Sequence, residues 1–105
     1  MGLRILDDAL VMVKAAYGVA LVIERRDRDL ARQLRRSNSS VVLNIGEGTH
    51  SDRGNRVMRY KNAMASASEV RTTLKVAEAV GFIVVDAELD DRLDKIVATM
   101  WRLTH

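Results

Sequence analysis

Polar side chains able to do chemistry gather in the middle of the chain, in the segment that reads QLRRSNSSVVLNIGEG. Ser40 precedes Asn44 by four residues and Glu47 follows it by three, so on a helix the three side chains share one face. Amides and carboxylates clustered in this way could bind a ligand. The serines lack an activating base, because no histidine lies in register with them and no glycine elbow is present. We therefore expect no nucleophilic catalysis here.

A second pair, Ser66 and Glu69, has the same three-residue relation later in the chain. The interpretation that we favour is a polar network between two helices, in which Arg36 neutralises a carboxylate and the small residues allow close packing. Removing one partner of such a buried pair would strand the other. The positions assigned to this structural polar motif are Arg36, Ser40, Asn44, Glu47, Ser66 and Glu69.

Glu47 and His50 form a Glu-x-x-His pair, which is a ligand element of di-iron helical bundles. Such a centre needs a second copy of the pair and a glutamate from each of two further helices. The only other histidine is His105, and Gly48 is expected to end the helix between Glu47 and His50. We predict no metal and no cofactor. A metal-dependent, ferritin-like enzyme is the weakest alternative, because ligands could still be shared between subunits.

Basic residues are concentrated in one part of the chain. From Arg25 to Lys75 there are twelve Lys or Arg against five Asp or Glu, a balance of +7, whereas the rest of the chain has a balance of −4. Thirteen arginines against four lysines favour phosphate, which the planar guanidinium binds well. Only four residues are aromatic, so base stacking has little support. The predicted nucleic-acid contacts are Arg28, Arg32, Arg35, Arg53, Arg56, Arg59 and Lys61.

That charge also has a less specific interpretation. Asp27 and Asp29 lie among the arginines and could pair with them locally, and a basic stretch is often only a solvated helix face. In that case the arginines would serve subunit contacts, and the protein would be a structural adaptor without nucleic-acid binding.

The elements that must position these side chains are helical, because the chain has no proline and six glycines. Apolar spacing predicts a first helix over 3–24, a charged connector over 24–29, and a second helix that runs to about Glu47 and ends at Gly48. Ser51 or Asp52 caps a third helix that Gly81 stops, and Asp86 caps a fourth. We expect residues 1–105 to form a single all-α domain, an antiparallel up-down-up-down four-helix bundle.

The first helix has two apolar stripes, whereas one is enough to face a bundle core. One stripe comprises Leu6, Leu10, Val13, Tyr17, Ala20 and Leu21, and the other comprises Ile5, Met12, Val19 and Ile23. Two stripes on one helix predict burial on both sides, and hence a subunit interface.

Two segments resemble the motifs of a known family. RRSNSSVVLNIGEG, residues 35–48, resembles the segment of the 23S rRNA intervening-sequence proteins that reads approximately Arg-Ala-x-x-Ser-Ile-Pro-x-Asn-Ile-Ala-Glu-Gly. AMASASEV, residues 63–70, resembles their Ala-x-Gly-Ser-x-x-Glu-Leu element. This chain departs from the pattern at Val42, Gly46 and Ala65. The resemblance covers nearly the whole chain and implies a four-helix bundle.

The same family includes the accessory variability determinant proteins of diversity-generating retroelements. The resemblance therefore implies a basic homopentameric ring that binds RNA or DNA, with a reverse transcriptase as a further partner. The function expected is that of a non-enzymatic, nucleic-acid-associated scaffold or accessory protein.

The chain has no cysteine, which suits a reducing compartment and excludes disulfides. Its most apolar run, Val11 to Ile23, is interrupted by Lys14 and is too short to span a membrane. We expect a cytoplasmic protein with no membrane partner.

Overall fold

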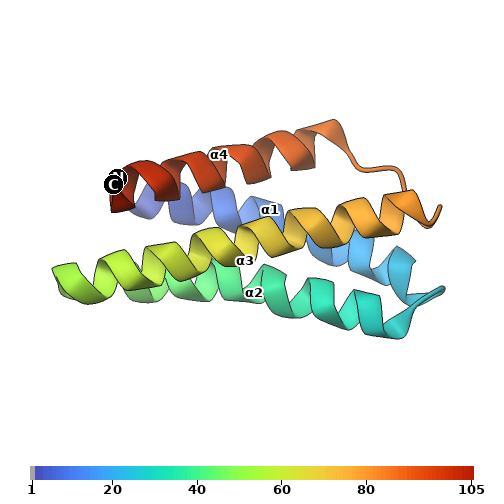
Figure 1. The fold of residues 1–105 in the computed structure, drawn as a ribbon, viewed down its shortest axis with the longest axis horizontal. Helices are drawn as coiled ribbons and strands as arrows, with labels where there is room; N and C mark the ends of the chain where they lie inside the picture. Colours follow the sequence, from blue (N-terminus) through green and yellow to red (C-terminus); the bar gives the residue numbers. More distant parts are fainter. Residues whose placement is uncertain (1) are drawn as a thin grey trace.

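The computed structural model describes residues 2–105 and confirms an all-α architecture. Its four helices are α1 (Gly2–Glu24), α2 (Arg28–Thr49), α3 (Arg53–Ala79) and α4 (Ala87–Thr104). Successive helices run in opposite directions and pack side by side (Figure 1). The described residues contain no β-strand. None of their helices combines the length and the apolar character that crossing a membrane requires.

Three aspartates set where helices begin. The carboxylate of Asp27 accepts a hydrogen bond from the N–H of Leu30 at 2.9 Å, and Asp52 accepts one from the N–H of Asn55 at 3.0 Å. Asp86 caps α4 in the same way. Each satisfies an N–H that has no partner inside the helix. The predicted caps at Asp52 and Asp86 are thus present, while Asp27, treated as part of a connector, is also a cap.

Gly81 ends α3, as predicted, and is the one described residue with a positive φ, +82°. The N–H of Phe82 donates to the carbonyl of Ala77 at 2.9 Å, and the N–H of Gly81 donates to that of Glu78 at 3.0 Å. These two bonds form the Schellman pattern, which needs a left-handed residue that glycine adopts without strain. The Phe82 side chain then packs against the core.

The predicted role of Gly48 is wrong, because α2 continues through it to Thr49. Gly48 is buried against the ring of Tyr60, and a Cβ added there would lie 2.5 Å from Cε1 of that ring. The glycine therefore permits a close approach of α2 and α3 near their shared turn. A helix-ending conformation is not needed at this position.

The core takes one of the two stripes of α1. Ile5, Met12 and Ile23 are buried, together with Ala9, Ala16 and Ala20. Of the other stripe, Leu10, Tyr17 and Leu21 are exposed, while Leu6 and Val13 pack partly against the core. Val11 and Val22 are exposed as well. Alanines on the inward face of α1 let the helix pack closely, while Leu10, Val11, Tyr17, Leu21 and Val22 remain exposed.

Candidate nucleic-acid interface

The antiparallel order of the helices separates the predicted basic residues into two groups at opposite ends of the bundle (Figure 1). We call residues 24–36 the α1–α2 end; they include Arg28, Arg32 and Arg35. We call residues 47–61 the α2–α3 end. It includes the other four predicted phosphate contacts, which are Arg53, Arg56, Arg59 and Lys61.

At the α1–α2 end two of the six arginines form ion pairs with acids of the same end. Arg35 pairs with Glu24 at 2.6 Å, and Arg32 pairs with Asp29 at 2.9 Å. Residues 24–29 contain three arginines and three acidic residues, so this turn has no net charge. The guanidinium of Arg26 lies 5.9 Å from the ring centre of Phe82, within reach of a cation–π contact.

At the α2–α3 end two arginines hold the local structure together. Arg59 forms an ion pair with Glu47 at 2.9 Å, which joins α3 to α2. Arg56 donates to the backbone carbonyls of Gly48 and Ser51, each at 3.3 Å. A cation at these carbonyls complements the negative end of the α2 dipole. The Arg56 charge is therefore satisfied by hydrogen bonds without an opposing carboxylate.

Arg53 and Lys61 lie in a stretch, residues 53–61, that contains no acid. Both are exposed, and neither takes part in an ion pair within residues 2–105. Asp52, which precedes this stretch, is the N-cap of α3, and its carboxylate accepts hydrogen bonds from Asn55. The α2–α3 end thus has two uncompensated cations on the first three turns of one helix.

Half of the polar motif forms a network between α2 and α3. The hydroxyls of Ser40 and Ser66 are 2.7 Å apart, and the Asn44 amide donates to the Ser40 hydroxyl at 3.1 Å and to its carbonyl at 2.9 Å. All three side chains are half-buried. Short hydroxyl side chains at this contact let the helices approach, as the favoured interpretation required.

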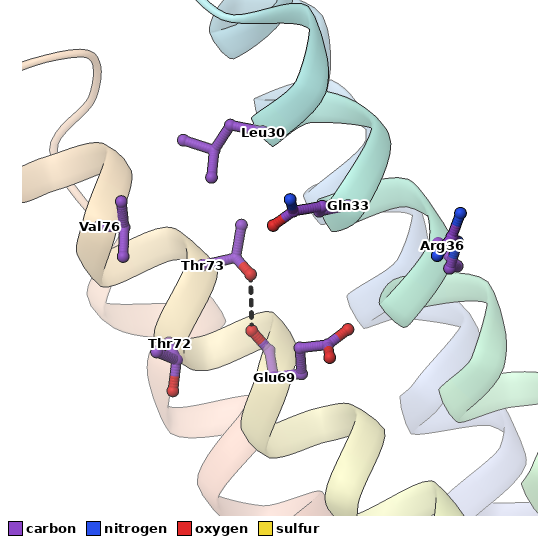
Figure 2. Close-up of a pocket in the computed structure, with 7 residues that line it drawn as sticks. All are labelled: Leu30, Gln33, Arg36, Glu69, Thr72, Thr73 and Val76. Carbon is purple, nitrogen blue, oxygen red and sulfur yellow. Dashed lines mark hydrogen bonds between the residues drawn. The ribbon is translucent and has the colours of Figure 1, made fainter.

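The other half of the motif does not join it. Glu47 turns to Arg59, and Arg36 and Glu69 are both exposed, so the expectation of a buried, neutralised pair is wrong for these two. They lie on opposite walls of a groove of about 410 Å³ between α2 and α3 (Figure 2). Within the described chain no ion pair joins them. The inward lean expected for Arg36 fails because Ser37 and Asn38, one and two residues later, take the buried positions.

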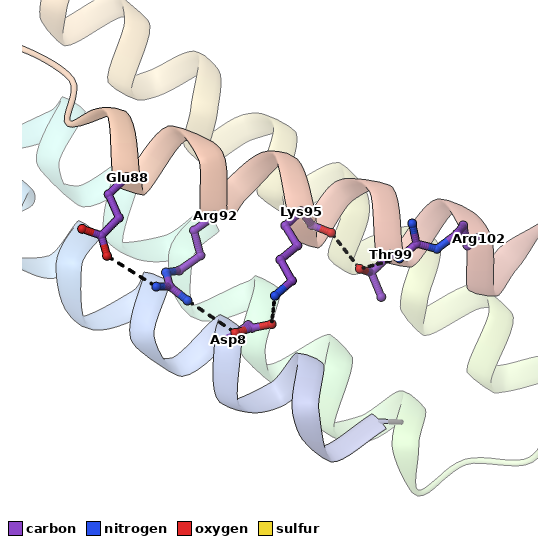
Figure 3. Close-up of polar contacts among 6 residues, drawn as sticks. All are labelled: Asp8, Glu88, Arg92, Lys95, Thr99 and Arg102. Atoms are coloured by element: carbon purple, nitrogen blue, oxygen red, sulfur yellow. Dashed lines mark hydrogen bonds and ion pairs between the residues drawn. The ribbon is translucent and has the colours of Figure 1, made fainter.

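An ion cluster elsewhere ties α4 to α1 (Figure 3). The Asp8 carboxylate, whose side chain is 18% exposed, contacts Arg92 at 3.4 Å and Lys95 at 3.2 Å. Arg92 also reaches Glu88 at 3.6 Å. Because these cations are engaged by acids, the cluster has a structural role.

The Glu-x-x-His element has no metal-binding geometry in the described residues. The Glu47 carboxylate is engaged by Arg59, and His50 follows the last residue of α2 as its C-cap. No three His, Asp or Glu side chains of residues 2–105 gather in a way that could hold a metal ion.

Two features escaped the sequence analysis. Asn38 is fully buried; its amide donates to the carbonyl of Val13 at 3.0 Å, and its own oxygen has no partner among the described residues. Trp101 and His105 stack on each other with ring centres 3.4 Å apart. The four-residue spacing of these two rings on a helix is the signal that could have predicted the stack.

No match was found among curated proteins or among solved structures. A family model described as 23S rRNA-intervening sequence protein matches residues 1–103, almost the whole chain. The matched region contains the four helices except the last residue of α4, the Ser40–Asn44–Ser66 network and both basic ends. The resemblance seen in the two motif segments is thereby confirmed, and the chain belongs to the family of 23S rRNA-intervening sequence proteins.

Proposed function

We propose that this protein is a non-enzymatic scaffold or accessory protein that binds the phosphates of RNA or DNA through its α2–α3 end. The observation that supports this most is the pair Arg53 and Lys61, two exposed cations with no ion pair in the described chain. Eight residues of helix separate them, roughly 12 Å at 1.5 Å per residue. Binding through phosphates alone would have little sequence preference.

The proposal includes a homo-oligomer, with the outward face of α1 as the subunit interface. Leu21 is 61% exposed and Val11 is 51% exposed, and Leu10, Tyr17 and Val22 lie exposed on the same helix. Apolar surface of this extent on one helix is typical of an interaction site. A ring of subunits, a pentamer as the resemblance implies, would repeat the α2–α3 end and strengthen weak phosphate contacts by avidity.

A finer form of the proposal rests on the resemblance alone. As in the accessory variability determinant proteins, the oligomer would present bound nucleic acid to a reverse transcriptase. The cysteine-free sequence suits the reducing cytoplasm in which such a complex would act.

Phosphate binding is tested by measuring affinity for RNA and for DNA duplexes across a salt series. Each neutralised phosphate contributes about −0.9 to the slope of log K against log salt. Lys61→Ala should therefore reduce the slope by about 0.9 for each subunit in contact. Lys75→Ala is the matched control, because Lys75 is also an exposed lysine of α3 but lies far from the α2–α3 end. This variant should leave the slope of log K against log salt unchanged. Wild-type protein that binds neither nucleic acid at low salt would overturn the proposal and favour the adaptor function.

The oligomer is tested by light scattering at micromolar concentration. A charge at the most exposed apolar residue of the α1 face, Leu21→Lys, should convert the assembly to smaller species because an unpaired charge is costly to bury. Val84→Lys is the control: Val84 is 88% exposed and lies outside the four helices. A wild-type mass equal to that of the monomer would contradict this part of the proposal.

A further inference from the structure

Trp101 and His105 form an aromatic stack on the outside of the bundle. Their ring planes are within 20° of parallel, and Trp101 is 54% exposed although His105 covers one face of the indole. Trp101 is the only tryptophan of the chain. A large aromatic ring left in water gives up the burial that usually stabilises it, so packing of the single chain does not explain its position.

The stack is held in place by hydrogen bonds. Nδ1 of His105 lies 3.1 Å from the Trp101 carbonyl and 3.1 Å from the Thr104 hydroxyl. That hydroxyl in turn donates to the carbonyl of Met100 at 2.8 Å. The imidazole is thus anchored to the last turn of α4, and the indole that it covers has little freedom to rotate. A flat surface that is already ordered loses less entropy when a ligand stacks on it.

Trp101 lies on the side of α4 that faces α3. Arg71 of α3 contacts both Asp90 and Asp94 of α4, at 3.1 Å and 2.5 Å, which sets how the two antiparallel helices align. Trp101 is two turns beyond Asp94 on the same face of α4. Because α3 and α4 are antiparallel, the matching position on α3 is two turns before Arg71, at residue 64. Lys61 is one turn further along α3, which begins with Arg53 at the end of the bundle where α4 ends (Figure 1).

We infer that the Trp101–His105 stack, with Lys61 and Arg53, is a binding site for single-stranded nucleic acid. This inference rests on the proposed function and adds a preference for unpaired bases. A base would stack on Trp101 while neighbouring phosphates meet the two cations, a combination typical of single-strand binding. A duplex already uses its base faces internally and could offer only phosphates. The cations favour a polyanion over a second copy of this chain, whose isoelectric point is about 9.7.

The test uses the single tryptophan as its own reporter. Purified full-length protein is titrated with oligothymidylate and with a DNA duplex of the same length, at the same salt. Trp101 fluorescence reports stacking, and the anisotropy of a dye on the nucleic acid reports binding. We expect oligothymidylate to quench the tryptophan emission as it binds, and the duplex to bind without quenching it.

Variants separate stacking from charge. Trp101→Leu should weaken binding of oligothymidylate by about five- to 150-fold, the change that corresponds to one lost base–aromatic stack, and leave duplex binding unchanged. Trp101→Phe, which keeps an aromatic ring, should retain part of the affinity. Arg102→Ala is the matched control, since Arg102 is an exposed neighbour that turns to Thr99. Circular dichroism confirms that each variant is folded.

The outcomes are distinguishable. Binding of both nucleic acids without quenching overturns the inference and leaves the proposed function standing. Tryptophan emission that shifts with protein concentration and not with nucleic acid shows that another subunit covers the stack, and this too overturns the inference. Absence of any binding overturns the proposed function itself.

Discussion

The two ends of this bundle, with six and four basic residues, use them differently. At the α1–α2 end, Arg32 and Arg35 are each paired with an acid, and the turn over residues 24–29 is neutral. At the α2–α3 end, Arg56 bonds to backbone carbonyls, and Arg53 and Lys61 have no ion pair in the described chain. Arg25 and Arg28 have no ion pair among residues 2–105 either, but they alternate with Glu24, Asp27 and Asp29 in the neutral turn, whereas residues 53–61 contain no acid.

The ends also differ in how their helices meet. Asp27 caps α2 at the α1–α2 end, and Schellman bonds around Gly81 end α3 in the α3–α4 turn at the same end of the bundle. The α2–α3 end depends on contact between Gly48 and the Tyr60 ring and on the Glu47–Arg59 pair. The availability of Arg53 and Lys61 therefore depends on a tightly packed turn that other residues stabilise.

The largest effect is expected where the α2–α3 end is packed most closely. Gly48→Ala should destabilise the protein by about 1–3 kcal/mol, because the new Cβ would overlap the Tyr60 ring. Gly46→Ala is the matched control two residues earlier in α2. Its Cβ would meet nothing within 4 Å, and it should stabilise the helix by up to about 1 kcal/mol. Chemical denaturation measures the change in free energy of unfolding for both variants. Changes of the same sign would show that the contact between Gly48 and the Tyr60 ring does not determine how this end packs.

A smaller effect is expected at the cluster that attaches α4, and with it Trp101, to α1. Asp8→Asn keeps the size of the side chain but removes the charge that faces Arg92 and Lys95, and should cost about 1–2 kcal/mol. Asp7→Asn is the control, because Asp7 is exposed and a surface change of this kind usually stays within about 0.5 kcal/mol. Thermal melting at low and high salt should show the Asp8 effect shrinking as salt rises. Equal melting temperatures of the two variants would show that the ion cluster around Asp8 does not stabilise the fold.

The smallest effect is expected in the groove between α2 and α3. Glu69→Ala should change the free energy of unfolding by no more than about 0.5 kcal/mol, since the carboxylate is exposed and forms no ion pair among residues 2–105. Ser66→Ala, one turn earlier, breaks the bond to Ser40 and should cost about 0.5–1.5 kcal/mol. If Glu69→Ala lowered the free energy of unfolding more than Ser66→Ala does, Glu69 would belong to a buried pair with Arg36, as the sequence suggested.

The fold could be predicted from the sequence because its signals are local. Apolar spacing defined four helices, and Asp52, Asp86 and Gly81 mark boundaries through bonds that span only a few residues. Gly48 was misread because a glycine near a helix end serves either a left-handed turn or a close contact. The ring that decides between them, Tyr60, comes from the next helix.

The candidate site was harder to predict, for a similar reason. Spacing on one helix placed Ser40 and Asn44 together correctly, but whether an arginine is paired depends on the acids of neighbouring helices. Arg35 reaches Glu24 across a turn, and Arg59 reaches Glu47 on another helix. Arg36 and Glu69 show the limit of face assignments: a shift of one residue around a helix moves a side chain from the core to the surface.

The central claim is that the α2–α3 end, and not the α1–α2 end, contacts nucleic acid. The most direct measurement is the salt dependence of duplex binding for two double variants, Arg53→Ala with Lys61→Ala and Arg25→Ala with Arg28→Ala. All four residues are exposed, so neither variant should unfold the bundle. The first should reduce the slope of log K against log salt by about 1.8 for each subunit in contact, from two lost phosphate contacts, and the second should leave it close to wild type. A slope that falls equally in both variants, or more in the second, would contradict the account.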